Sequence, residues 1–184
     1  MRKNNINLVL VILLVIMAVT ARIVNANLHM PNYAPLIAIS LFSGAIINDK
    51  RGLAYLVPVF GQLLADVYFS AFTNIIGFYG IIGMVFNYGG LICATALGSG
   101  MKLKPLNAFY YTFGAATLFF IISNFGFYLQ GWNTYSFAGL VKTYIDGVPF
   151  FKYTVEGNMV CCTVLFGGYF FFQQLFFKPS KVRA

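Results

Sequence analysis

Charged residues, and acidic ones above all, are scarce in this sequence of 184 residues. Only four side chains are Asp or Glu, charged residues make up 9%, and hydrophobic residues make up 60%. Because soluble domains carry about a quarter charged residues, this composition excludes an ordinary soluble domain. Catalytic signatures are missing as well, with no H-E-x-x-H, G-x-S-x-G or P-loop pattern and no row of carboxylates. We therefore expect a membrane protein that is not an enzyme and that drives no ATP-dependent step by itself.

Cysteine and histidine are also rare. Cys93, Cys161 and Cys162 are the only cysteines, and all three lie in apolar runs, where they are typical small buried side chains. No cysteine lies in a predicted external loop, so a disulfide framework is not expected. His29 is the only histidine. We expect no resident metal site and no cofactor.

The apolar runs that remain, at roughly 20 residues per membrane crossing, occupy nearly the whole chain. They predict one all-α transmembrane domain over residues 1–184, a bundle of six helices at about 6–25, 35–48, 52–72, 78–98, 107–130 and 154–177, with an external amphipathic segment at about 137–145. The first run has no clear cleavage site and is predicted to be a retained helix. The second, at about 21 Å, is too short for a hydrocarbon core of about 30 Å. Either the preceding loop enters the bundle or neighbouring helices shield this helix.

The formal charge of +8 is explained by the positions of the basic residues. Nine Lys or Arg side chains lie at alternate ends of successive apolar runs and only three at the other ends, which are Arg22, Lys142 and Lys152. Positive charge concentrates on the cytoplasmic side of membrane proteins. The bias predicts that both termini are cytoplasmic, in a multi-pass protein of the bacterial inner membrane. The basic excess is thus a topology signal and does not indicate nucleic-acid binding.

Polar residues at membrane depth are costly, at about 2.5–3.5 kcal/mol for a charged side chain, so each is a candidate for function. Arg22, Asp66 and Asn124 are estimated to lie roughly 21–27 Å above the cytoplasmic ends of their helices. Glu156 and Asn158 lie within the first two turns of the last helix, counted from outside. All five therefore fall in the outer third of the bilayer. Asn87 lies lower, where it could form the floor of a cavity. We expect these side chains to converge on an outward-facing pocket for a polar ligand; the alternatives are a structural ion pair of Arg22 with a carboxylate, or an arginine that reaches the interface.

The link between the first two helices covers this predicted site. Pro31 and Pro35 stiffen it by fixing φ and removing backbone donors. Trp132 and Tyr135, in the longest external segment, are the best candidates for a lid, although an aromatic belt would give the same pattern. The candidate substrate-binding residues are Arg22, His29, Asn32, Asp66, Asn87, Asn124, Trp132, Glu156 and Asn158.

Small residues recur in the fourth helix as Gly90-xxx-Ala94-xxx-Gly98. Such a face lets another helix approach closely. It predicts either tight packing within the bundle or a docking surface for another subunit.

Several of these residues fall into a pattern that resembles a family of small bacterial membrane proteins of uncharacterised function. The pattern consists of Arg22, His29-x-Pro31-Asn32-Tyr33-x-Pro35-x-x-Ala38, Asp66, Ser123-Asn124-Phe125-Gly126 and Pro149-Phe150-Phe151 followed by Gly157-Asn158. That family is similar in size, helix number and loop placement to the S components, the substrate-binding subunits of energy-coupling factor vitamin transporters. Gly157-Asn158 stands where the resemblance leads us to expect Gly-Asp, and Glu156 supplies a neighbouring carboxylate.

The resemblance implies a vitamin or related micronutrient as ligand, and a transmembrane coupling subunit with ATPases as partner. Some S components are solitary, including ones that carry cobalamin, so His29 could ligate a cobalt corrinoid; the alternative is a solvated histidine. Two functions follow from the sequence. One is a membrane uptake component that binds a small organic molecule in an outward-facing polar cavity. The other is a non-catalytic structural or assembly subunit of a larger membrane complex.

Overall fold

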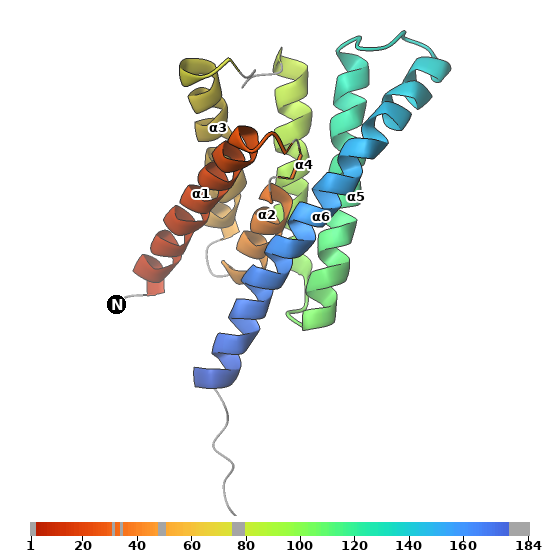
Figure 1. Ribbon diagram of the computed structural model, residues 1–184. Coiled ribbons are helices and arrows are strands. Elements are labelled where there is room, and N and C mark those ends of the chain that lie inside the picture. Colours follow the sequence, from red (N-terminus) through yellow and green to blue (C-terminus); the bar gives the residue numbers. More distant parts are fainter. Residues whose placement is uncertain (1–2, 31, 34, 48–50, 75–79, 177–184) are drawn as a thin grey trace, which may run out of the picture.

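The structure, a computed structural model, describes residues 3–30, 32–33, 35–47, 51–74 and 80–176. Within them the chain is all-helical: α1 (Lys3–Asn27), α2 (Leu36–Ile46), α3 (Arg51–Phe72), α4 (Gly80–Gly100), α5 (Pro105–Leu129) and α6 (Phe137–Phe176) (Figure 1). Every one except α2 is long and apolar enough to cross a membrane, which makes five such helices among the described residues. The prediction of an all-α bundle of six helices is confirmed, and the chain has the make-up of a multi-pass membrane protein.

The short helix α2 lies at the centre of the bundle and contacts each of the other five helices. All residues from Leu36 to Ala45 are buried. The other helices form an arc around it in the order α1, α3, α4, α5, α6, and within the described residues α1 and α6 do not contact each other. Of the two explanations for its short length, shielding by neighbours is therefore the one observed.

Glycines set the distance between α2 and α4. A Cβ atom added at Gly44 would lie 2.0 Å from the carbonyl oxygen of Thr95, and one at Gly98 would lie 2.1 Å from that of Leu41. Only glycine fits at such a close approach of two backbones. Gly90, in the same predicted small-residue face, packs instead against the ring of Phe119 on α5. The face on α4 therefore packs within the bundle.

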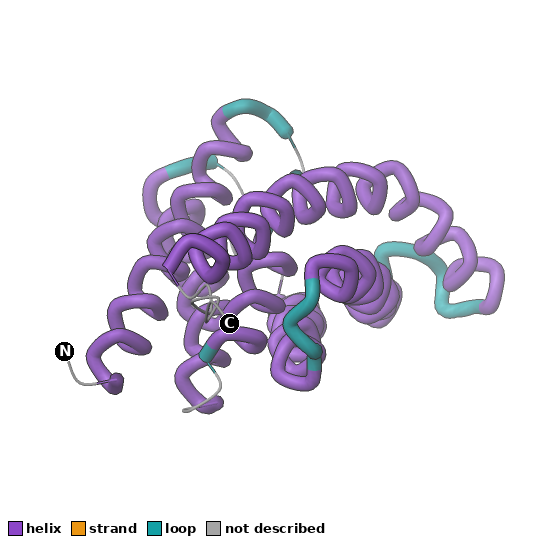
Figure 2. The backbone as a smooth tube through the Cα atoms, turned by 90° about the horizontal axis from the view of Figure 1, so that it is seen from below, coloured by secondary structure: helices purple, strands orange, loops and turns teal. Residues whose placement is uncertain are grey.

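Helix α6 differs from the prediction. The segment 137–145, predicted as a separate amphipathic piece, is the first part of one helix of 40 residues that continues to Phe176. Pro149 lies inside it without ending it; membrane helices tolerate proline where neighbours satisfy the freed backbone groups. At 1.5 Å per residue the helix is about 60 Å long, twice a hydrocarbon core, and it runs obliquely across the bundle (Figures 1 and 2).

The start of α1 and the end of α6 lie at the same end of the bundle (Figure 1). The opposite end holds the end of α3, the start of α4 and the α5–α6 hairpin, and the α1–α2 link lies lower in Figure 1, beside the start of α2. This second end is the one that the basic residues predict to face outward.

Candidate functional site

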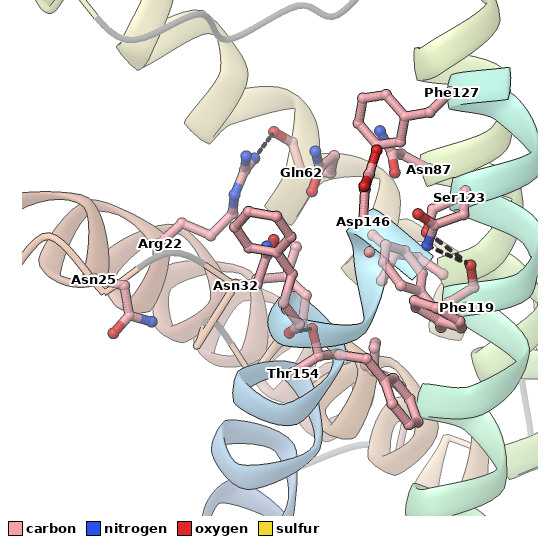
Figure 3. Close-up of a pocket in the computed structure, with 18 of the residues that line it drawn as sticks. Arg22, Asn25, Asn32, Gln62, Asn87, Phe119, Ser123, Phe127, Asp146 and Thr154 are labelled. Carbon is pink, nitrogen blue, oxygen red and sulfur yellow. Dashed lines mark hydrogen bonds between the residues drawn. The ribbon is translucent and has the colours of Figure 1, made fainter. Parts of the chain in front are cut away.

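A cavity of about 840 Å³ opens at the end of the bundle opposite the N-terminus. Its lining comes from all six helices and from the α1–α2 and α5–α6 links. Figure 3 shows lining side chains from α1, α3, α4, α5 and α6 and from the α1–α2 link around one space. The polar lining residues are Arg22, Asn25, His29, Asn32, Gln62, Asn87, Ser123, Asn124, Asn133, Thr143, Asp146 and Thr154, and the aromatic ones are Phe69, Phe119, Phe120, Phe127, Trp132, Phe150 and Phe151. Polar groups on an aromatic background are typical of small-molecule sites.

The α1–α3 side of the cavity is organised by a buried ion pair. Arg22 Nη1 lies 2.7 Å from Asp66 Oδ1 and donates also to the backbone oxygen of Gln62 at 3.2 Å. Asp66, 1% exposed, accepts further hydrogen bonds from the Gln62 amide at 3.1 Å and from the Tyr88 hydroxyl at 3.0 Å. The guanidinium also lies over the ring of Phe69, 5.3 Å from its centroid. Asp66 thus sits behind the cavity and neutralises Arg22, which lines it.

The α6 side carries a second charge pair of a different kind. Lys142 Nζ lies 2.7 Å from Asp146 Oδ2, and the two side chains are 62% and 52% exposed. An exposed pair at i, i+4 contributes only about 0.3–0.5 kcal/mol. Asp146 lines the cavity, whereas Lys142 does not. The carboxylate of Asp146 is therefore held weakly and can exchange its partner.

Two carboxamides on this side have their orientation fixed by the protein. The Asn124 amide donates to the Phe120 carbonyl at 2.8 Å. The Asn133 amide donates to Thr143 Oγ1 at 2.9 Å, and that hydroxyl donates to the Gly139 carbonyl. Since a hydroxyl has one proton, Asn133 must be the donor. Each amide uses one of its two N–H groups in this bond, so it leaves its oxygen and one N–H for other partners.

The floor of the cavity is formed where α2 begins. Leu36 and Ile37, the first residues of α2, line it together with Asn87 and Leu91 of α4. Asn87, predicted as the lower member of the site, lines the cavity and makes no side-chain hydrogen bond to the part of the chain that the structure describes. An unpaired carboxamide at this depth is available to a ligand or to water.

The α1–α2 link lies against the cavity through His29, Met30 and Asn32. His29 has φ +53° and ends α1: its N–H bonds to the Ala26 carbonyl, and the N–H of Met30 bonds to that of Asn25. This is a Schellman motif, in which the left-handed position is usually glycine. The backbone of His29 is therefore fixed by the helix end, and its imidazole is exposed beside the cavity. Pro31 lies outside the described residues.

Gly157 and Asn158 hold this link from α6 and do not line the cavity. A Cβ atom at Gly157 would lie 2.2 Å from the Tyr33 carbonyl oxygen. Asn158 is fully buried, and its Oδ1 accepts a hydrogen bond of 2.8 Å from the N–H of Ala38 in the first turn of α2. The first N–H groups of a helix have no partner within the helix. Asn158 was predicted to bind the substrate, but it caps the central helix α2 and lies outside the cavity lining.

Glu156 also lies away from the predicted site. Its side chain is 45% exposed on the outside of α6, 3.9 Å from Lys152. The prediction rested on its estimated height, and a height does not say which way a helical side chain points. Two residues beyond Thr154, which lines the cavity, Glu156 is about 200° further round the helix.

The structure therefore brings six of the nine predicted residues to the cavity, namely Arg22, His29, Asn32, Asn87, Asn124 and Trp132, with Asp66 directly behind Arg22. The sequence reasoning missed Asn25, Gln62, Asn133 and the α6 wall, including Asp146. The available signal was a helical stripe: positions 143, 147, 150 and 154 recur every three or four residues, the period of one helix face. It was missed because the helix was expected to begin only after Pro149.

Comparison with known proteins agrees with the resemblance to an uncharacterised family. No curated protein and no solved structure matches the chain. Residues 2–180 match a family of unknown function, DUF6580, and this match covers nearly all of the sequence and the whole of all six helices. The chain therefore belongs to the DUF6580 family.

Proposed function

We propose that this protein binds a small organic molecule in the cavity at the outer end of the bundle and serves as the membrane-embedded component of an uptake system. The observation that carries the proposal is the cavity itself, whose 840 Å³ lies in the range of small-molecule sites. Uncommitted amide and guanidinium groups in it provide hydrogen bonds, and its aromatic rings provide surface for the body of a ligand.

The floor of the cavity supports access from one side only. Below it lies α2, buried on all sides and packed against α4 at glycine contacts. A ligand that enters from the outer end meets the start of α2 and cannot continue without a rearrangement of the bundle. A binding step from outside followed by an energised change is the behaviour of S components. On this proposal a coupling subunit with ATPases supplies the energy, and a vitamin or related micronutrient is the ligand.

The small-residue faces on α2 and α4 do not distinguish uptake from a structural subunit. Either function could use these faces: uptake to dock a coupling subunit or to let the bundle tilt, and assembly to contact other subunits of a complex. Gly44 and Gly98 instead face the partner helix inside the bundle. These faces are occupied and not available to another protein.

Thermal unfolding of the purified chain against pools of small metabolites tests the proposal. A ligand at roughly 100 times its Kd stabilises by about 2.7 kcal/mol, so we expect the unfolding midpoint to rise by about 5 °C or more with one chemical class. The variant Asn87→Leu, which removes the free carboxamide at the floor, should lose that response. Asn107→Leu is the matched control, because Asn107 lies at the other end of the bundle and bonds only to the Lys102 carbonyl. No stabilisation by any pool would argue against ligand binding.

A further inference from the structure

The two charge pairs at the cavity differ in which charge they leave available. The positive charge of Arg22 is balanced by Asp66, a carboxylate that is 1% exposed and that also accepts hydrogen bonds from Gln62 and Tyr88. Breaking that pair would leave a buried charge without a partner. Asp146 has only an exposed lysine one helical turn away, and exposed pairs are weak and screened by salt. The charge in this cavity that is free to pair with a ligand is therefore the negative charge of Asp146.

Hydrogen-bond acceptors gather around the same turn of α6. Thr143, Asp146 and Gly147 lie within one turn, and all three line the cavity. Asn133 is tied to Thr143 by its amide N–H. Asn124 Oδ1 lies against Gly147, where an added Cβ would approach it to 2.4 Å. Two carboxamides and the Asp146 carboxylate thus flank one stretch of helix, and each amide has one N–H bonded to a protein acceptor.

Aromatic rings complete this side of the cavity. Phe127 packs edge-on against Trp132, with 5.8 Å between the ring centroids, and Phe120 packs against Phe151 at 4.8 Å. All four rings line the cavity. The faces of aromatic rings attract cations. A carboxylate, amide oxygens and aromatic faces are all suited to a positively charged donor, and the carboxylate would repel an anion.

From these contacts we propose that the α6 side of the cavity is a subsite for a cationic, hydrogen-bond-donating group of the ligand, such as a protonated amine or amidine, and that Asp146 is its carboxylate partner. The inference rests on the proposed function and specifies the chemical class of its ligand. On binding, the ammonium replaces Lys142 as the partner of Asp146 and donates to the oxygens of Asn124 and Asn133. The lysine is released to water at no large cost because it is already 62% exposed.

Three probes with one indole ring and different end groups test the subsite: tryptamine, which is cationic, tryptophol, which is neutral, and indole-3-propionate, which is anionic. Binding to the full chain is measured by titration in nanodiscs of phosphatidylcholine, which carry no net charge that would concentrate either ion. We expect the wild-type affinity to fall in the order tryptamine, tryptophol, indole-3-propionate. Asp146→Asn should weaken tryptamine binding about tenfold, equivalent to roughly 1.4 kcal/mol, and leave tryptophol unchanged, which also shows that the variant is folded.

Glu156→Gln is the matched control, since it removes a carboxylate with its own i, i+4 lysine from the same helix but outside the cavity. It should leave the affinity for all three probes unchanged. Tighter binding of indole-3-propionate than of tryptamine, an equal loss in both variants, or no effect of Asp146→Asn would each overturn the subsite while leaving ligand binding in the cavity intact. Failure of all three probes to bind would also overturn it, and the proposed function is then decided separately by the metabolite pools and the Asn87→Leu variant.

Discussion

Asp66 is a carboxylate whose oxygens are all committed to the protein. It accepts from Arg22, from Gln62 and from Tyr88, which come from α1, α3 and α4. A charge at this depth is tolerated only because these partners replace water. The same network holds the guanidinium of Arg22 at the cavity wall. The ion pair that appeared as an alternative to a ligand site is therefore compatible with one, because it positions a lining residue.

Asp66→Asn is expected to destabilise the protein. It removes the counter-charge of Arg22, and removing one partner of a buried pair costs roughly 3–5 kcal/mol; because Arg22 is 15% exposed to the cavity, we expect the lower end, about 3 kcal/mol. The double variant Arg22→Gln, Asp66→Asn should recover part of this loss, since no unpaired charge remains. Thermal unfolding in detergent measures both. A double variant less stable than the single one would show that the charges do not compensate each other.

Individual site residues could be predicted from the sequence only in part. The height of a polar residue follows from its position in an apolar run, and this placed Arg22, Asn87 and Asn124 correctly near the cavity. The direction of a side chain depends on the helix phase and on neighbours. For that reason Glu156 was placed at the cavity although it faces away from it, and Asp146 was overlooked although it lines the cavity.

At the scale of elements, the order and number of helices were predictable, and their ends were found to within a few residues for α1 to α5. These helices have clear apolar runs separated by basic or polar turns. Helix α6 was not predictable as one element, because its first half is polar enough to resemble a surface segment and because Pro149 suggests an end. The central position of α2 was also hidden, since a short apolar run does not reveal how many neighbours surround it.

The contact between α2 and α4 makes a sharp prediction about glycines. Gly98→Ala would place a methyl group 2.1 Å from the Leu41 carbonyl oxygen, and overpacking of this kind costs typically about 1–3 kcal/mol. Gly89→Ala on the same helix has nothing within 4 Å and should be neutral or stabilising by up to about 1 kcal/mol. The two thermal unfolding midpoints should therefore shift in different directions or by clearly different amounts. Equal shifts would contradict the close approach of the two helices.

At the scale of the whole molecule, five helices form an arc around α2, and the cavity lies within that arc above the start of α2, on the side predicted to face outward. The α1–α2 link, held by Gly157 and Asn158, lies at the side where α1 and α6 do not meet in the described chain. The part of the molecule with the most irregular backbone is therefore next to the cavity. Irregular backbone at membrane depth is found where it is buried in protein or lines a cavity.

The orientation in the membrane is predicted by the bias of the basic residues. Single cysteines at Asn32 and Tyr135 should react with a membrane-impermeant maleimide added outside intact cells, because both positions lie at the end with the cavity and are exposed. A cysteine at Lys102, in the turn between α4 and α5, should react only after the cells are opened. The unsubstituted chain, with its cysteines inside the helices, gives the background. Labelling at Lys102 from outside would reverse the assigned orientation.

The most direct test of the central claim, that the outer cavity holds a small organic molecule, is mass spectrometry of the small molecules released from the purified protein. We predict one organic compound in fixed ratio to the wild-type chain. It should be retained by Asn107→Leu and lost from Asn87→Leu, whose substitution lies at the cavity floor. If the wild-type protein releases only lipid and detergent, or if the same compound remains bound to Asn87→Leu, the cavity is not the binding site that we propose.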